Sequence, residues 1–243
     1  MGFLIYIKEY IKNNNINHNN DYINHNNEYI NYNVVFSDWR IILLIEHILI
    51  YWIYSYYILY INNVDKKYYI PSKEVLCNVL TNQIMGTLTF YFFNLNTINK
   101  PIENINLYEI FIMIIDMIIL SIIQSIYFYI MHRLFHTKFL YKHIHYLHHK
   151  NYITIPYTAV NCDIIEHVLI NIMSVLIGTK LWLCHQNSII IWVWLSTYSS
   201  VNTHSNIIRQ NNPVRHDFHH LLKNVNYGSG YEFMDKLFGT YKD

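Results

Sequence analysis

The chain has 243 residues, of which 53% are hydrophobic and 14% are charged, and its formal net charge is +1. Soluble domains carry about 25% charged residues, so this composition favours a protein embedded in a membrane. The lack of a basic surplus argues against nucleic acid as a partner. Three cysteines without a CxxC pair argue against a disulfide framework or a zinc ribbon.

The first 36 residues are predicted to form a disordered, asparagine-rich tail. From Asn13 to Asn33 the chain is about half asparagine, and such a tract buries too little apolar surface to offset the entropy lost on ordering. No cleavable signal peptide is expected, because residues 1–12 are only weakly apolar.

Five apolar segments follow the tail, and they predict an all-α, multi-pass membrane helical bundle. The segment 108–131 is the strongest candidate for a span, with Asp116 as its only charge after the first turn. Glu46 and His47 interrupt the first segment, so the number of true crossings before residue 108 stays open. The last two segments are short and are expected to form a hairpin that crosses or re-enters the membrane. The segments cover residues 41–61, 75–95, 108–131, 168–183 and 188–198.

The placement of lysine and arginine predicts the orientation of the bundle. If all five segments cross, the loops on the side of residues 132–150 hold twelve of the 17 Lys and Arg residues, and the other side holds five. Cytoplasmic loops carry the excess of positive charge, so the side with residues 132–150 is predicted to face the cytosol.

Three histidine clusters lie on that predicted cytosolic side: "HRLFH" at 132–136, "HYLHH" at 145–149 and "HDFHH" at 216–220. Side chains at i, i+3 and i+4 of a helix share one face, so each cluster can present two or three imidazoles in one direction. Neutral imidazole suits iron, zinc, copper and nickel. Eight histidines exceed the four ligands of a structural zinc ion and therefore suggest two metal ions. The eight are His132, His136, His145, His148, His149, His216, His219 and His220.

These motifs resemble the fatty acid hydroxylase superfamily, the membrane di-iron oxygenases that include sterol desaturases, methylsterol oxidases and sphingolipid or fatty-acid hydroxylases. The resemblance covers residues 108–240 and is carried further by "YKHIHYLHHK", "NNPVRHDFHH" and "NYGSGYEFMDKLFGT". Residues 108–243 are accordingly expected to form a histidine-box catalytic domain, and residues 37–107 to form N-terminal membrane helices.

The resemblance implies an enzyme that binds two iron ions and uses O2 to hydroxylate or desaturate a lipid, namely a sterol, a sphingolipid or a fatty acyl chain. Electrons would come from an external, NAD(P)H-fed donor of the cytochrome b5 type with its reductase, because the chain has no GxGxxG fingerprint. The expected location is the endoplasmic reticulum membrane, with the site facing the cytosol.

The resemblance also implies roles for residues outside the eight. His204, in "HSN", is similar to a further metal ligand of the family. Asp217 and Glu166 are expected to accept hydrogen bonds from ligand rings and so to orient them. His143 and His185 are expected to be neighbours or structural residues and not ligands.

Some features depart from the family pattern and leave alternatives open. Where the family often has HPxE, this chain reads "DIIE", with Glu166 in place and His167 directly after it; metal binding by His167 is left open. A zinc-dependent membrane hydrolase and a non-catalytic metal-binding membrane protein are the alternative functions. HExxH is absent and the first two clusters contain no carboxylate, which argues against hydrolysis.

Overall fold

The computed structural model describes residues 39–62, 65–93, 97–98, 106–150, 154–205, 215–229 and 232–242. Some side chains within these ranges are not described, among them those of Glu46 and Asp217. The predicted asparagine-rich tail lies outside the described residues.

The described part of the chain is mostly helical, as the sequence predicts. The α-helices are α3 (Trp39–Ile61), α4 (Lys73–Phe92), α5 (Leu107–Phe135), α6 (Lys138–Leu140), α7 (Tyr146–His149), α8 (Ile164–Glu166), α9 (Met173–Leu181), α10 (Gln186–Thr203), α11 (Arg215–Leu222) and α12 (Phe233–Leu237). Two π-helical segments, η3 (Tyr141–His145) and η5 (His167–Ile172), and two 3-10 turns, η2 (Lys66–Tyr68) and η4 (Pro156–Thr158), connect them. Two short strands, β1 (Thr97–Ile98) and β2 (Cys184–His185), pair in parallel.

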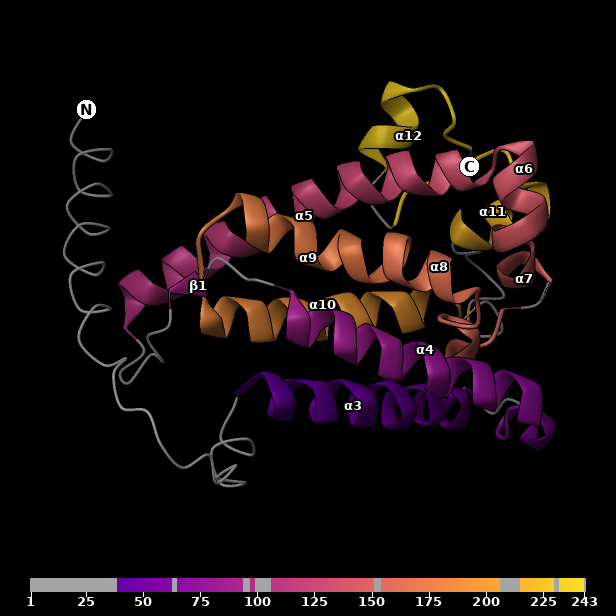
Figure 1. Cartoon of the computed structure of the whole chain (residues 1–243), viewed down its shortest axis with the longest axis horizontal. Helices are drawn as coiled ribbons and strands as arrows, with labels where there is room; N and C mark the ends of the chain where they lie inside the picture. Colours follow the sequence, from indigo (N-terminus) through magenta and orange to yellow (C-terminus); the bar gives the residue numbers. More distant parts are fainter. Residues whose placement is uncertain are drawn as a thin grey trace, which may run out of the picture. The chain divides into compact units, whose positions relative to one another are not determined.

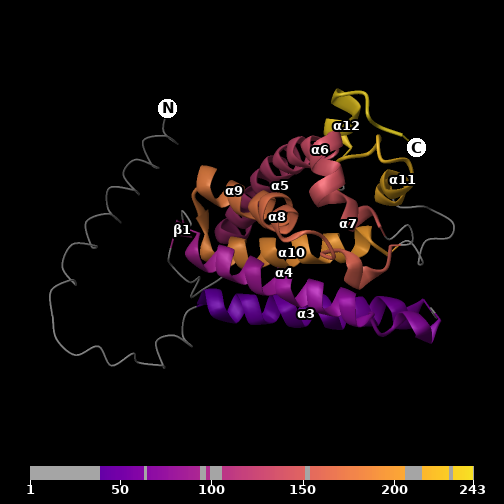
Figure 2. The same ribbon diagram turned by 45° about the vertical axis from the view of Figure 1, so that its right-hand side comes forward.

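The long helices lie side by side in one bundle (Figures 1 and 2). Helix α5 packs against α9, and α10 packs against α3. Close approach of α5 and α9 depends on Gly178, because a Cβ atom there would lie 2.8 Å from the Leu120 Cδ2 atom. Leu120 is fully buried and belongs to the main apolar core, together with Leu43, Phe90, Leu176, Cys184, Ile189, Trp192 and Val193.

The two helical arms of the predicted hairpin are longer than the apolar segments 168–183 and 188–198. Segments α8, η5 and α9 follow one another without a break from Ile164 to Leu181, and α10 has 18 residues. Polar residues at both ends, among them Glu166, His167 and Thr203, belong to these helices although they interrupt the hydrophobic pattern. Glu166 contacts His145, as described below, and Thr203 donates to the Ser200 carbonyl within its own helix at 2.9 Å, so the helices accommodate these polar side chains.

Two helices in the described ranges, Leu107–Phe135 and Ile164–Leu181, are long and apolar enough to cross a membrane by length and composition. The predicted segments 41–61 and 75–95 also form helices, α3 and α4, and the stretch His47–Ile61 of the first is a shorter apolar helix. Helix α5 presents a row of exposed isoleucines at four-residue spacing, and this row winds gradually around the helix because each step of four residues turns by about 40°. These are Ile110, Ile114, Ile118, Ile122, Ile126 and Ile130.

The charge inside the strongest apolar segment has a structural explanation. Asp116 is buried in α5, where one carboxylate oxygen accepts a hydrogen bond from Trp182 Nε1 at 2.8 Å. The other oxygen accepts hydrogen bonds from Ser188 Oγ at 2.6 Å and from the backbone N–H of His185 at 3.3 Å. Asp116 therefore joins α5 to the turn between α9 and α10.

Candidate metal centre

All nine predicted metal-ligand histidines come together at one end of the bundle. His132 and His136 lie at the C-terminal end of α5, and His204 follows the last residue of α10. The other six lie on η3, α7 and α11, which gather at this same end (Figures 1 and 2). They are His145, His148, His149, His216, His219 and His220.

The nine side chains form two groups, each with one ring nitrogen per residue within 4.8 Å of all the others. We call them the five-histidine cluster and the four-histidine cluster. All nine rings are buried except that of His136, which is half-buried. The five-histidine cluster consists of His132, His136, His145, His149 and His219, and the four-histidine cluster consists of His148, His204, His216 and His220.

The two clusters divide each HxxHH motif between them, which the sequence does not reveal. In the second motif the i and i+4 residues, His145 and His149, belong to the five-histidine cluster, and His148 belongs to the four-histidine cluster. In the third motif the assignment is reversed, since His219 joins the five-histidine cluster. Each helix therefore lies between the two clusters and contributes to both.

Within each cluster the Nε2 atoms converge. His145 Nε2 lies 2.9 Å from His136 Nε2 and 3.0 Å from His149 Nε2. His216 Nε2 lies 3.2 Å from the Nε2 atom of His204 and 3.1 Å from that of His220. A ring nitrogen offers only one hydrogen or one lone pair, so a single Nε2 atom cannot form good hydrogen bonds to two neighbours.

A metal ion explains this convergence. Metal–imidazole bonds are about 2.0–2.1 Å long, so two nitrogens bound at a right angle to each other lie about 2.9 Å apart, and at a tetrahedral angle about 3.4 Å apart. The Nε2–Nε2 distances of 2.9–3.2 Å around His145 and His216 fall in this range. The donor set of each cluster fits one metal ion.

The opposite nitrogen of several rings is fixed by a backbone carbonyl. His132 Nδ1 lies 2.8 Å from the carbonyl oxygen of Tyr227, and His219 Nδ1 lies 2.7 Å from that of Val225. His204 Nδ1 lies 3.0 Å from the Ser200 carbonyl in the same way. A carbonyl only accepts, so each Nδ1 carries the hydrogen and each Nε2 keeps its lone pair for the cluster.

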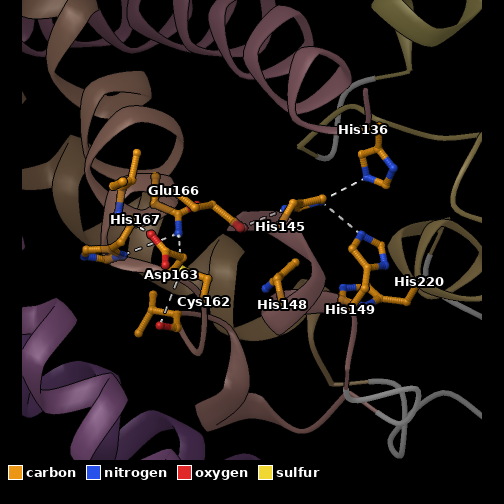
Figure 3. Close-up of polar contacts among 12 residues, drawn as sticks. His136, His145, His148, His149, Cys162, Asp163, Glu166, His167 and His220 are labelled. Atoms are coloured by element: carbon orange, nitrogen blue, oxygen red, sulfur yellow. Dashed lines mark hydrogen bonds and ion pairs between the residues drawn. The ribbon is translucent and has the colours of Figure 1, made fainter. Parts of the chain in front are cut away.

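His145 has a carboxylate in place of a carbonyl. Its Nδ1 atom lies 2.8 Å from Glu166 Oε2, and both side chains are buried (Figure 3). Burial raises the pKa of Glu166, so the contact alone does not assign the proton. With a metal ion on Nε2, Nδ1 would carry the hydrogen, and an ionised Glu166 would increase the basicity of the ring, as carboxylate partners of metal-binding histidines do. Glu166 was predicted to orient a ligand ring, and the structure places it against His145.

Burial keeps these imidazoles neutral. It lowers the pKa of His204 to about 4 and that of His136 to about 2. The pKa values of His148, His216 and His220 are also held well below the usual value, first by burial and then by repulsion from neighbouring imidazoles. Neutral rings at pH 7 retain the lone pairs that metal ligation needs.

We expect Glu166→Gln to weaken metal binding about tenfold or more, because the amide is a poorer acceptor for His145 Nδ1–H and carries no charge. Competition with a chelator measures this affinity in the purified protein. Asp163→Asn is the matched control: Asp163 caps α8 by accepting from the backbone N–H of Ile165 at 2.8 Å, and asparagine also caps helices well. Equal affinities for Glu166→Gln and the wild type would contradict the assignment.

The other described histidines with a predicted role lie outside the two clusters. His143 is exposed, and its Nδ1 lies 2.8 Å from the Phe139 carbonyl. His185 directly precedes α10, whose other end carries His204. His167 is buried in η5 but belongs to neither cluster. The side chain of Asp217 is outside the described set, so its orienting role stays a prediction.

A cavity of about 330 Å³ adjoins both clusters. Its histidine wall includes His132, His145 and His148, and its apolar walls come from α4, α5, η5, α9 and α10. The volume lies within the range of about 300–1,000 Å³ that is common for small-molecule sites. Apolar residues of these walls include Phe90, Phe128, Ile170, Val175, Leu176 and Trp192.

The fold and the site define a mostly helical protein with a two-part histidine centre suited to metal ligation. Residues 117–240 match the sequence model of the fatty acid hydroxylase family. The chain belongs to the fatty acid hydroxylase family, as its histidine motifs predict.

Relatives with curated names are similar to parts of the chain. A Dictyostelium discoideum protein described as a candidate methylsterol monooxygenase is 35% identical over 49% of this chain and 47% of its own length. An Oryza sativa very-long-chain aldehyde decarbonylase is 30% identical over half of each chain. Sphinganine C4-monooxygenase 2 of Arabidopsis thaliana is 24% identical over 80% of this chain and 85% of its own length. The chain spans about half the length of the first two relatives, and no solved structure matches it.

Proposed function

We propose that this protein is a membrane-bound oxidoreductase that holds two iron ions in its histidine clusters and uses O2 to hydroxylate or desaturate a lipid. The observation that carries the proposal is the pair of clusters, with nine ring nitrogens beside one largely apolar-walled cavity. The names of the relatives support lipid chemistry, because each describes an enzyme that acts on a sterol, a sphingoid base or a very long chain.

The fit of the site favours a redox metal. Iron bound in the clusters would supply the activation of O2 needed to break an unactivated C–H bond, which side chains cannot do alone. Among the described residues, the carboxylate of Glu166 contacts His145 Nδ1 and so orients a ring, whereas a hydrolase would need such a group free to act as a general base. The chain's own residues would hold the metal, position the lipid and exclude water.

The clusters themselves exclude water by burial. Four carbonyl or carboxylate contacts, from Tyr227, Val225, Ser200 and Glu166, hold rings in the tautomer that presents Nε2 to the centre. Contacts of this kind fix the orientation and the tautomer of each ring once its helix is in place. The cavity would place an apolar chain against the histidine wall.

The proposal includes a location and an electron source. The row of exposed isoleucines on α5 supports contact with lipid, and two helices have the length and composition of spans. We propose a multi-pass arrangement in the endoplasmic reticulum membrane with the clusters on the cytosolic side, following the distribution of Lys and Arg. Electrons would come from a separate NAD(P)H-fed donor of the cytochrome b5 type through its reductase.

Metal analysis of the full chain tests this proposal directly. We expect two iron ions per chain in protein purified in detergent from cells supplied with iron, one ion for each cluster. Lipid profiles of a deletion strain would then identify the substrate by the precursor that accumulates. Stoichiometric zinc without iron would contradict the oxygenase and favour a hydrolase, and a protein without bound metal would contradict both.

A further inference from the structure

The same cavity is lined by polar side chains that the metal centre does not use. His47 of α3, Gln83 of α4 and His167 of η5 all face it, although none belongs to a histidine cluster. His47 and His167 are near enough to repel one another if both were protonated. In Figure 3 the Glu166 side chain reaches toward His145, and the His167 ring lies on the other side, away from the clusters.

Gln83 offers a hydrogen-bond donor to the cavity. Its Oε1 atom accepts from Trp52 Nε1 at 3.0 Å. An indole N–H can only donate, so the amide oxygen must face Trp52 and the NH2 group must point elsewhere. The Gln83 Nε2 atom is buried and has no hydrogen-bond partner among the described residues.

His167 offers a second donor. Asn171 Nδ2 lies 3.4 Å from His167 Nδ1, and an amide NH2 donates, so Nδ1 accepts and Nε2 carries the hydrogen. His167 Nε2 is buried and makes no hydrogen bond of standard geometry with a described residue, although the backbone carbonyl of Asn82 lies close enough to act as a weak acceptor. Gly86 leaves room for this ring, because a Cβ atom there would lie 3.0 Å from His167 Nε2.

His47 offers an acceptor. Its Nδ1 atom lies 2.6 Å from Thr197 Oγ1, and the Thr197 hydroxyl already donates to the Val193 carbonyl at 2.7 Å. Thr197 must therefore accept from His47, which makes Nδ1 the protonated nitrogen of that ring. His47 Nε2 then carries a lone pair.

We propose that His47, Gln83 and His167 form a recognition site for a hydroxyl group of the lipid, separate from the histidine clusters. A hydroxyl donates one hydrogen and accepts through two lone pairs, which matches one acceptor and two donors. A plain hydrocarbon would leave buried polar groups without partners, and such groups oppose binding. This inference rests on the proposed function in taking a lipid as the occupant of the cavity.

The local backbone supports a functional role for this site. His167 begins the π-helical segment η5, and Asn171 lies four residues further along the same segment. Short π-helical turns inside α-helices occur frequently at functional sites. The segment follows Glu166 directly, so one stretch of chain supplies the contact to His145 and the proposed hydroxyl site.

Equilibrium binding of matched probes to the full-length protein in detergent tests the site without turnover. The probes are 1-octadecanol with octadecane, and cholestanol with cholestane, which differ only in a hydroxyl. We expect at least one alcohol to bind about tenfold more tightly than its hydrocarbon, the effect of roughly one additional hydrogen bond. A difference within the octadecanol pair would indicate a site for a hydroxyl on an acyl chain, and a difference within the cholestanol pair would indicate a site for a hydroxyl on a sterol ring. Equal binding within both pairs would overturn the proposal.

Variants assign the preference to these residues. His167→Phe and Gln83→Met remove one donor each and are expected to bring alcohol and hydrocarbon to similar affinities. Thr87→Val is the matched control, because Thr87 lines the same cavity and its hydroxyl donates to the Gln83 carbonyl in its own helix at 2.7 Å. Thermal unfolding identifies the variants that are folded. The assignment would be refuted if a folded His167→Phe or Gln83→Met variant still preferred the alcohol to the hydrocarbon. Loss of that preference in Thr87→Val would also refute it.

The metal content of the same samples separates this site from the proposed function. Alcohol preference in a protein that lacks iron would support the hydroxyl site and contradict the oxygenase. A protein that binds two iron ions and shows no preference for alcohol would support the oxygenase and contradict the hydroxyl site.

Discussion

Replacing His219 by alanine is expected to remove iron from the five-histidine cluster and to abolish turnover. His219 is fully buried, and its Nδ1 is held by the Val225 carbonyl, so its Nε2 is directed to the cluster and has no hydrogen-bond partner in the described part of the chain. Alanine supplies no ligand and leaves a buried space beside the other four rings. The measurements are iron per chain and the amount of oxidised lipid in membranes that express the variant.

His185→Ala is the control for this experiment. His185 precedes α10 at the end opposite His204, and its side chain is outside both clusters, so its loss is expected to leave iron content unchanged. The backbone N–H that contacts Asp116 is retained in the variant. Iron retained in His219→Ala and lost in His185→Ala would show that the metal is bound elsewhere.

Replacing Asp116 by leucine is expected to cause the largest loss of stability. Three donors, from Trp182, Ser188 and the backbone of His185, would lose their acceptor in a buried position. An unsatisfied buried donor costs about 1–3 kcal/mol, so the combined effect is on the order of several kcal/mol. Thermal unfolding in detergent measures it.

Asp116→Asn is the matched variant for this position. Asparagine keeps one oxygen and nearly the same shape, so we expect a smaller loss of stability than with leucine. Equal stability of the leucine variant and the wild type would mean that the bonds to Asp116 do not hold the α9–α10 turn against α5.

The sequence predicted eight of the nine histidines because helical spacing is a local property, whereas His204 was expected only through the resemblance. His132 and His136, or His145 and His149, lie within one or two turns, and their shared face follows from the helix repeat alone. The division of each motif between two clusters could not be predicted, since it depends on how α5, α7 and α11 meet. The π-helical turn η3, which ends at His145, also has no signature in the sequence.

The hydrogen-bond partners of the histidine rings could likewise be predicted only in part. Glu166 was expected near the site through the resemblance, whereas the carbonyls of Tyr227, Val225 and Ser200 were not, because every residue carries a carbonyl. His47 was visible only as an interruption of an apolar segment, and Gln83 lies within the predicted segment 75–95. Thr197, which determines the tautomer of His47, is 150 residues away in the chain.

The division of each HxxHH motif between the clusters has a consequence for the order of assembly. The segment 145–149 and helix α11 each serve both clusters, so neither cluster can be completed while either segment is unordered. The first ion to bind bears the entropy cost of ordering both segments, and the second ion then meets ligands that are already in place. If both clusters bind metal as proposed, we expect their loading to be cooperative, so that a titration with metal contains few molecules that carry a single ion.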